Sequence, residues 1–155
     1  MKKVLVLLIL FSVLTVGLFA EQADYFTFTM GSGAGYDING DDVVASTVFG
    51  MDYTFNSTFT GGFKFFDIGG ISGRFINISV IPADKLRLTV YTGTTGPVPA
   101  TAAFGVGLSY DLFSKKDALF SNMSINIDWL ADASGSYDVA NGGVILFGLR
   151  TQVGL

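Results

Sequence analysis

The chain has 155 residues, of which 50% are hydrophobic and only 14% are charged. It contains no histidine and no cysteine, which excludes disulfides, thiolate chemistry, the usual proton shuttle and the commonest metal ligand. Acidic residues outnumber basic ones by 13 to 9, so the composition lacks the excess of lysine and arginine that nucleic-acid binding calls for. Because a soluble surface usually carries about 25 to 35% charged positions, we expect many apolar side chains to face something other than water.

The N-terminus has the pattern of a secretory signal. Lys2 and Lys3 precede an apolar run that ends at Ala20, after which Glu21 restores polarity. This arrangement predicts a cleaved signal peptide over residues 1–20 and a single domain over residues 21–155. The alternative is a membrane anchor, but the run lies at the short limit for a spanning helix, about 17 residues.

Eight extended segments follow, each alternating apolar residues with small or polar ones. Such alternation places the two kinds of side chain on opposite faces of a strand, and segments of about ten residues suit a tilted membrane crossing. In the last segment, for example, Phe147 and Leu149 share one face and Arg150 and Gln152 the other. The approximate ranges are 24–33, 43–55, 59–66, 75–81, 86–93, 104–112, 122–129 and 142–155.

The segments and their connections predict an all-β fold: an eight-stranded antiparallel up-and-down transmembrane β-barrel. The last segment would pair with the first, which removes both sheet edges. Connections expected to be long lie at 35–42, 67–73, 94–101 and 131–141, and short ones at 56–57, 82–85 and 114–118. Short periplasmic turns and longer outer loops are typical of membrane barrels. The aromatic residues Tyr53, Phe55 and Tyr110 would then lie at the inner rim and Trp129 at the outer rim.

The inward faces carry six charged residues, three acidic and three basic. Because a charge inside a membrane barrel must be paired or hydrated, this balance predicts a salt-bridge network in a lumen that the side chains of eight strands can fill. We interpret the network as structural, with a small proton or ion leak as a lesser hypothesis. Its members are Asp52, Lys64, Arg87, Asp111, Asp128 and Arg150.

One predicted loop resembles the start of a calcium-binding loop. Asp37, Asn39 and Asp41 alternate around Gly40, and oxygen ligands at this spacing suit Ca²⁺. The match is weak, because position six is Asp42 instead of glycine and position twelve is Val48 instead of an acid. The favoured interpretation is a polar hairpin loop in which Asn39 and Gly40 supply positive φ angles, with no metal and no cofactor.

A signal followed by eight alternating segments, short inner turns and an alternating C-terminal segment resembles the small outer-membrane β-barrel families typified by OmpX and the OmpA transmembrane domain. The resemblance covers residues 21–155. The final residue is Leu155, where those families typically have an aromatic residue. The resemblance implies an outer-membrane location, contact with outer-membrane lipid, and recognition of the C-terminal strand by the outer-membrane assembly machinery.

The hypothesis that we favour is a non-enzymatic barrel with a structural or surface-interaction role, in which the outer loops meet a surface partner. A second hypothesis is a small gated barrel that transports ions or a hydrophobic molecule. A third is a secreted, soluble, lipocalin-like carrier with its apolar faces turned inward. A membrane-embedded lipid hydrolase is nearly excluded, because such enzymes commonly activate serine through histidine.

Overall fold

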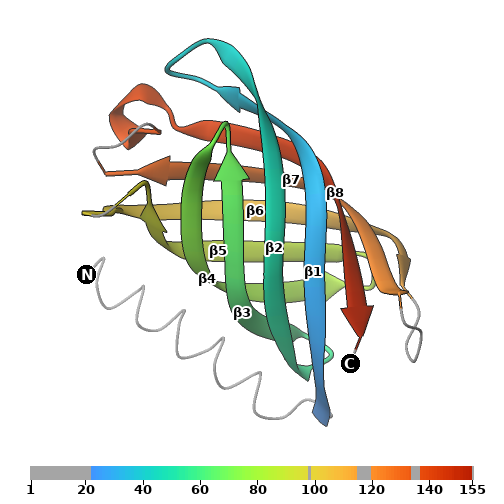
Figure 1. Ribbon diagram of the computed structural model, residues 1–155. Helices are drawn as coiled ribbons and strands as arrows, with labels where there is room; N and C mark the ends of the chain where they lie inside the picture. The colour runs from blue at the N-terminus through green and yellow to red at the C-terminus, as the bar shows by residue number, and fades with distance from the viewer. Residues whose placement is uncertain (1–21, 98, 115–119, 134–136, 155) are drawn as a thin grey trace, which may run out of the picture.

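The computed structural model describes residues 22–97, 99–114, 120–133 and 137–154, and within them the chain forms a closed barrel (Figure 1). Apart from the closing pair of β1 and β8, neighbouring strands in the barrel are also neighbours in sequence, and all pairs are antiparallel, as predicted. The strands are β1 (Gln22–Asp37), β2 (Asp42–Asn56), β3 (Phe59–Ile68), β4 (Ile71–Ala83), β5 (Leu86–Thr95), β6 (Thr101–Ser114), β7 (Phe120–Asp132) and β8 (Val144–Gly154), with a short 3-10 helix η1 (Val139–Asn141) before β8. Among the described residues, no helix is long and apolar enough to cross a bilayer. The predicted signal at residues 1–20 lies outside the described residues and stays a prediction.

The first and last strands close the barrel. β1 and β8 pair antiparallel, with Thr29 opposite Gln152 and Asp37 opposite Val144. From Thr27 to Asp37 this pairing covers the edge that β1 would otherwise expose. β1 extends to Asp37, several residues beyond its predicted end, because pairing with both β2 and β8 continues to that position.

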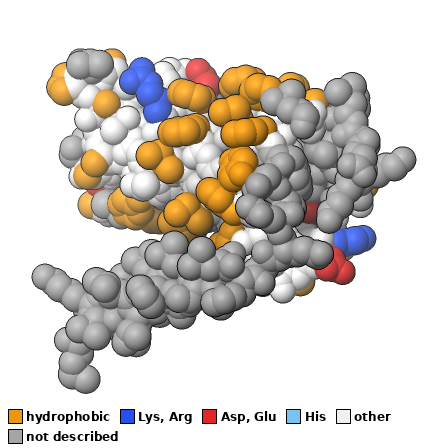
Figure 2. Space-filling model, turned by 90° about the horizontal axis from the view of Figure 1, so that it is seen from below, with side chains coloured by type: hydrophobic (Ala, Val, Ile, Leu, Met, Phe, Trp, Pro, Cys, Tyr) orange, Lys and Arg blue, Asp and Glu red, His pale blue; other side chains and the backbone are white. Residues whose placement is uncertain are grey.

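The two faces of the barrel wall differ in polarity as predicted. Phe49, Phe63 and Ile78 on the outer face are 53%, 54% and 56% exposed. Their inward neighbours include Asp52 and Asn77, which are 2% and 1% exposed. Figure 2 shows hydrophobic side chains gathered over the part of the wall in view. The alternation therefore turns the apolar side chains outward.

The connection between β3 and β4 is shorter than predicted. Residues 67–73 were expected to form a long loop, but only residues 69–70 lie between the strands, and Asp67 pairs with Ser72 in the ladder. Gly69 and Gly70 have φ angles of 58° and 86°, and two consecutive positive φ angles are what a tight type I′ hairpin needs. Long and short connections therefore do not alternate strictly.

The β1–β2 connection also differs in its backbone from the prediction. It consists of residues 38–41, and the residue with positive φ is Asp41, at 51°. The expectation that Asn39 and Gly40 adopt positive φ angles was wrong, because the loop has four residues, a length most often built around a type I turn instead of the type I′ turn.

Candidate functional site in the barrel lumen

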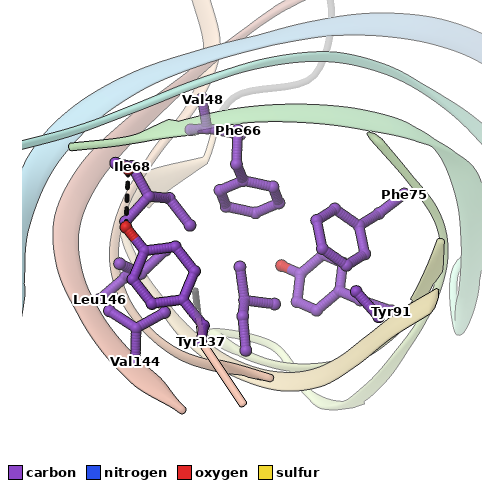
Figure 3. Close-up of a cluster of buried hydrophobic side chains, with 10 residues drawn as sticks. Val48, Phe66, Ile68, Phe75, Tyr91, Tyr137, Val144 and Leu146 are labelled. Carbon is purple, nitrogen blue, oxygen red and sulfur yellow. Dashed lines mark hydrogen bonds between the residues drawn. The ribbon is translucent and has the colours of Figure 1, made fainter. Parts of the chain in front are cut away.

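The lumen contains an apolar layer toward the end that carries the β3–β4 and β7–β8 connections. Phe66, Phe75 and Tyr91 meet edge to face, with centroid distances of 5.5 Å for Phe66–Phe75 and 5.6 Å for Phe66–Tyr91 (Figure 3). These rings come from β3, β4 and β5 at inward positions. The full apolar cluster comprises Val48, Phe66, Ile68, Phe75, Tyr91, Ala103, Leu130, Tyr137, Val144 and Leu146.

Tyr137, from the β7–β8 connection, completes this layer. Its side chain is 3% exposed, and its hydroxyl donates to the Ile68 carbonyl at 2.7 Å. Burial, followed by neighbouring carboxylates, raises the pKa of the Tyr137 phenol to about 12. Asp132 fixes the start of the connection, because it accepts from the Thr95 hydroxyl at 2.8 Å and the Tyr137 amide at 3.3 Å. Sequence reasoning missed Tyr137, which has no periodic pattern around it.

Two lumen ion pairs are present among the described residues, and the first joins β2 to β3. Lys64 Nζ pairs with Asp52 Oδ2 and donates to Thr29 Oγ1 at 2.8 Å. Thr29 donates in turn to Asp52 Oδ2 at 2.9 Å, while Asn77 Nδ2 donates to Asp52 Oδ1 at 2.9 Å. Both oxygens of this buried carboxylate therefore accept hydrogen bonds, which a buried charge requires.

The second ion pair joins β8 to β7. The Arg150 guanidinium pairs with Asp128 Oδ2 and donates to the Tyr91 hydroxyl at 3.0 Å. Tyr91 donates to Asp128 Oδ1 at 2.9 Å. The Arg150 guanidinium also lies over the Phe66 ring, 5.4 Å from its centroid. This pair therefore stands at the boundary between the polar residues and the apolar layer.

The other two predicted lumen charges do not form an ion pair. Arg87, on β5, donates to Gln152 Oε1 at 3.4 Å, and among the described residues no carboxylate pairs with it within 4.0 Å. Asp111, on β6, is 7% exposed, and its Oδ1 has no hydrogen-bond partner among the described atoms. The structure thus brings four of the six charged residues together in two pairs.

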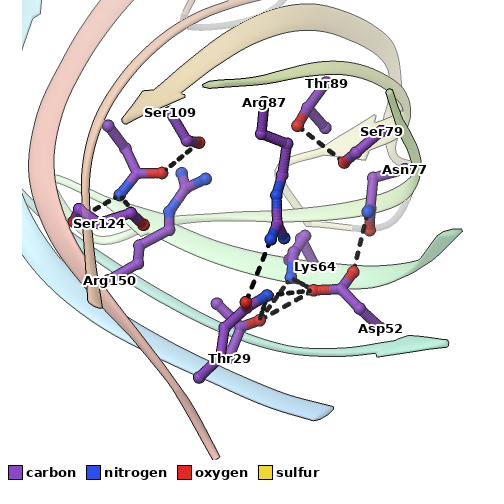
Figure 4. Close-up of polar contacts among 12 residues, drawn as sticks. Thr29, Asp52, Lys64, Asn77, Ser79, Arg87, Thr89, Ser109, Ser124 and Arg150 are labelled. Atoms are coloured by element: carbon purple, nitrogen blue, oxygen red, sulfur yellow. Dashed lines mark hydrogen bonds and ion pairs between the residues drawn. The ribbon is translucent and has the colours of Figure 1, made fainter. Parts of the chain in front are cut away.

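Small polar side chains, which no sequence motif marks as site residues, fill the space between the charges (Figure 4). Ser79 and Thr89 share a hydrogen bond of 2.8 Å. Ser109 donates to Asn126 Oδ1 at 2.5 Å, and Asn126 Nδ2 donates to Ser124 Oγ at 3.1 Å. Two cavities among the lumen side chains each have about 20 Å³ of space, which is room for roughly one water molecule.

The calcium candidates lie together in the β1–β2 hairpin, but their oxygens have other partners. Asp37 Oδ1 accepts from the Asn39 amide at 3.0 Å, and Asp41 Oδ1 accepts from the Tyr36 hydroxyl. Within the described residues, no group of three or more acidic side chains is arranged to hold a metal ion.

The aromatic residues expected at the rims lie near the corresponding strand ends. Tyr53 contacts Phe55 near the end of β2, with centroids 5.0 Å apart. Trp129 lies near the opposite end, in β7, where its Nε1 donates to the Gly142 carbonyl at 2.7 Å. It also contacts Phe104 edge to face, at 5.6 Å.

Comparison with solved structures identifies the fold. A protein from the work "De novo design of transmembrane beta-barrels" aligns with 87% of this chain and 100% of its own, with a TM-score of 0.51 and 11% identity. The fold is that of an eight-stranded transmembrane β-barrel. The solution NMR structure of the de novo designed TMB2.3 aligns with 86% of this chain and 95% of its own, with a TM-score of 0.50 and 12% identity.

A third similar structure is that of Ail, the attachment invasion locus protein of Yersinia pestis, in complex with the heparin analogue sucrose octasulfate. It aligns with 84% of this chain and 95% of its own, with a TM-score of 0.34 and 12% identity. No protein-family model and no curated protein matches the sequence. The likeness of this transmembrane β-barrel to known proteins is therefore one of fold.

Proposed function

We propose that the protein is a non-enzymatic β-barrel of the outer membrane, with a side-chain-filled lumen and a structural or surface-interaction role. The observation that carries this proposal is the outward direction of the apolar faces. Phe65, Val90 and Val106, from three different strands, are 51%, 60% and 53% exposed. Contact with lipid acyl chains would remove this surface from water, and the hydrophobic effect would then favour insertion.

The outward direction of the apolar faces also argues against a soluble carrier. A lipocalin-like carrier would need apolar side chains toward its lumen and polar ones outside. Here the lumen contains Asp52, Lys64 and Asn126, each at most 4% exposed, and the wall presents Phe49 and Leu149 outward. The narrow lumen cavities likewise support a filled barrel in preference to a transport path.

A surface role rests on the connections at the Tyr137 end of the barrel. The β1–β2 hairpin extends with three exposed apolar side chains, Tyr36 at 41%, Ile38 at 39% and Val43 at 68%. Exposed Asp41 and Asp42 lie between Ile38 and Val43 in the sequence. We propose that these connections face the exterior. We also propose that a signal peptide over residues 1–20 is removed and that the outer-membrane assembly machinery recognises the C-terminal strand β8.

The decisive experiment is a folding test of residues 21–155 in aqueous buffer and in detergent micelles. A β-type circular dichroism spectrum and a heat-dependent shift in gel mobility that require detergent would support the membrane barrel. A monomeric β-protein that folds in buffer alone would overturn it. Fractionation of cells that express the full chain, followed by surface labelling of an epitope inserted after Gly96, then tests both the membrane and the orientation.

A further inference from the structure

The polar half of the lumen contains a cavity whose charged lining is mostly basic. Three bases and one acid line it, namely Lys64, Arg87, Arg150 and Asp52. Figure 4 shows Arg87 and Arg150 reaching into the same region from opposite walls, with Ser124 on one side and Thr89 on the other. The full lining is Thr29, Asp52, Lys64, Ser79, Arg87, Thr89, Tyr91, Ser109, Ser124, Asn126, Arg150 and Gln152.

Among the described residues, one of these positive charges, that of Arg87, has no carboxylate within 4.0 Å. Lys64 is paired with Asp52, and Arg150 with Asp128. Arg87 donates a 3.4 Å hydrogen bond to the Gln152 side chain, and the Asp111 carboxylate on the neighbouring strand interacts with it electrostatically from a longer distance. A charge removed from bulk water is costly unless it is paired or hydrogen-bonded. The side chains that line the cavity thus carry more positive than negative charge, which favours an anion.

The hydrogen-bonding groups around the cavity point to the same kind of ligand. A hydroxyl has one hydrogen to donate. The Ser124 hydroxyl accepts from Asn126, which leaves its hydrogen available, and the Ser79–Thr89 hydrogen bond uses only one of their two hydroxyl hydrogens. The described buried oxygens without a partner belong to Thr60, Asn77, Asp111 and Asn122, and none of these residues lines the cavity. Hydroxyl hydrogens are therefore available to a hydrogen-bond acceptor in this space.

We propose that the cavity binds a small monovalent anion of the size of chloride, held by Arg87 and Arg150 and by the serine and threonine hydroxyls. The space of about 20 Å³ accommodates about one water-sized particle, which excludes large organic anions. Charge-assisted hydrogen bonds from guanidinium groups would supply most of the affinity. A bound anion would also separate the two arginines, whose like charges otherwise repel each other across the cavity.

The test is chloride NMR on the protein folded in detergent micelles. Exchange of chloride with the site should broaden the chloride resonance, and bromide should compete, whereas gluconate at equal ionic strength should not. Arg87→Gln should weaken chloride binding about tenfold or more, the effect of losing one charge-assisted hydrogen bond. Lys85→Gln, an equal charge change in the exposed β4–β5 turn, should leave binding unchanged.

A second variant keeps the test decisive if Arg87→Gln does not fold. Ser124→Ala removes one neutral donor and should weaken chloride binding about two- to tenfold. The proposal is overturned if the wild type gives no bromide-sensitive broadening, or if broadening in the folded variants equals that of the wild type. The membrane barrel proposed above would stand in either case, because its own test is folding in detergent.

Discussion

Arg150 lies over the Phe66 ring, with its guanidinium carbon 5.4 Å from the ring centroid, while the same guanidinium pairs with Asp128. One side chain therefore contacts both the apolar layer and the polar half of the lumen. The stem of an arginine packs well against apolar surface while its head keeps polar partners. Disturbing the Arg150–Asp128 pair should consequently affect packing as well as charge.

Asp128→Asn should be strongly destabilising, because it leaves the buried Arg150 charge without its carboxylate. Loss of one partner from a buried ion pair typically costs about 3 to 5 kcal/mol. The double replacement Asp128→Leu with Arg150→Met should cost less, since no uncompensated charge remains. The measurement is urea unfolding in detergent micelles. A single variant as stable as the wild type would contradict a contribution from this pair.

Ile125→Arg should destabilise the barrel in a lipid bilayer. Ile125 lies outward in the middle of β7 and is 47% exposed, where an arginine near the bilayer midplane costs about 2 to 4 kcal/mol. Ile38→Arg is the matched control, because the same substitution in the β1–β2 connection should cost about 1 kcal/mol or less near the interface. Equal losses for both variants, measured by unfolding in lipid vesicles, would refute the proposed membrane position.

The Tyr137 phenol should ionise at a higher pH than an ordinary tyrosine, so the free energy of unfolding should depend on pH in the alkaline range. Its pKa is raised from 10.0 to about 12, so folding favours the neutral phenol. The stability contributed by this difference is fully present below pH 10.0 and is lost as pH rises toward about 12. Ultraviolet titration of tyrosinate should show a late-ionising component that Tyr137→Phe lacks. Identical titration curves for the wild type and this variant would contradict the buried position of Tyr137.

Gly70→Val should destabilise the β3–β4 hairpin only because valine disfavours the positive φ angle of this position. Gly70 has a φ of 86°, and a Cβ atom there would meet nothing within 4 Å, so no steric clash contributes. Left-handed backbone costs an ordinary residue about 1 to 2 kcal/mol. Gly70→Asn should cost less, because asparagine tolerates positive φ. Thermal unfolding in micelles compares the two, and an equal loss would point to a different turn geometry.

The faces of the strands could be predicted because each strand separates two environments. Period-two alternation alone placed Phe49 outward and Asp52 inward, and the structure agrees. The β3–β4 connection could not be predicted in the same way, since Asp67, Gly69, Gly70 and Gly73 have the composition of a loop. The ladder pairing of Asp67 with Ser72 is decided by the turn geometry of two glycines.

The pairing of the lumen charges also lay beyond the sequence. The inward faces carry three acids and three bases, and this balance predicted a salt-bridge network without saying which residues pair. Contacts depend on strand register, however, and Asp128 lies opposite Leu146 in the β7–β8 ladder, so the long Arg150 side chain must reach across to it. Arg87 lies opposite Ser109, two positions from Asp111, and no carboxylate of the described residues lies within 4.0 Å of it. Register and side-chain reach are not readable from composition.

The β1–β8 pairing has a consequence for the order of assembly. Seven of the eight ladders join strands that are consecutive in sequence, so each can form as a local hairpin. The eighth joins residues such as Thr29 and Gln152, which are 123 positions apart, and contacts at such separation form slowly. Until the two ends of the chain meet, β1 presents unpaired backbone groups that can recruit strands from other molecules. Shortening the chain at its C-terminus would prolong that exposure and favour aggregation.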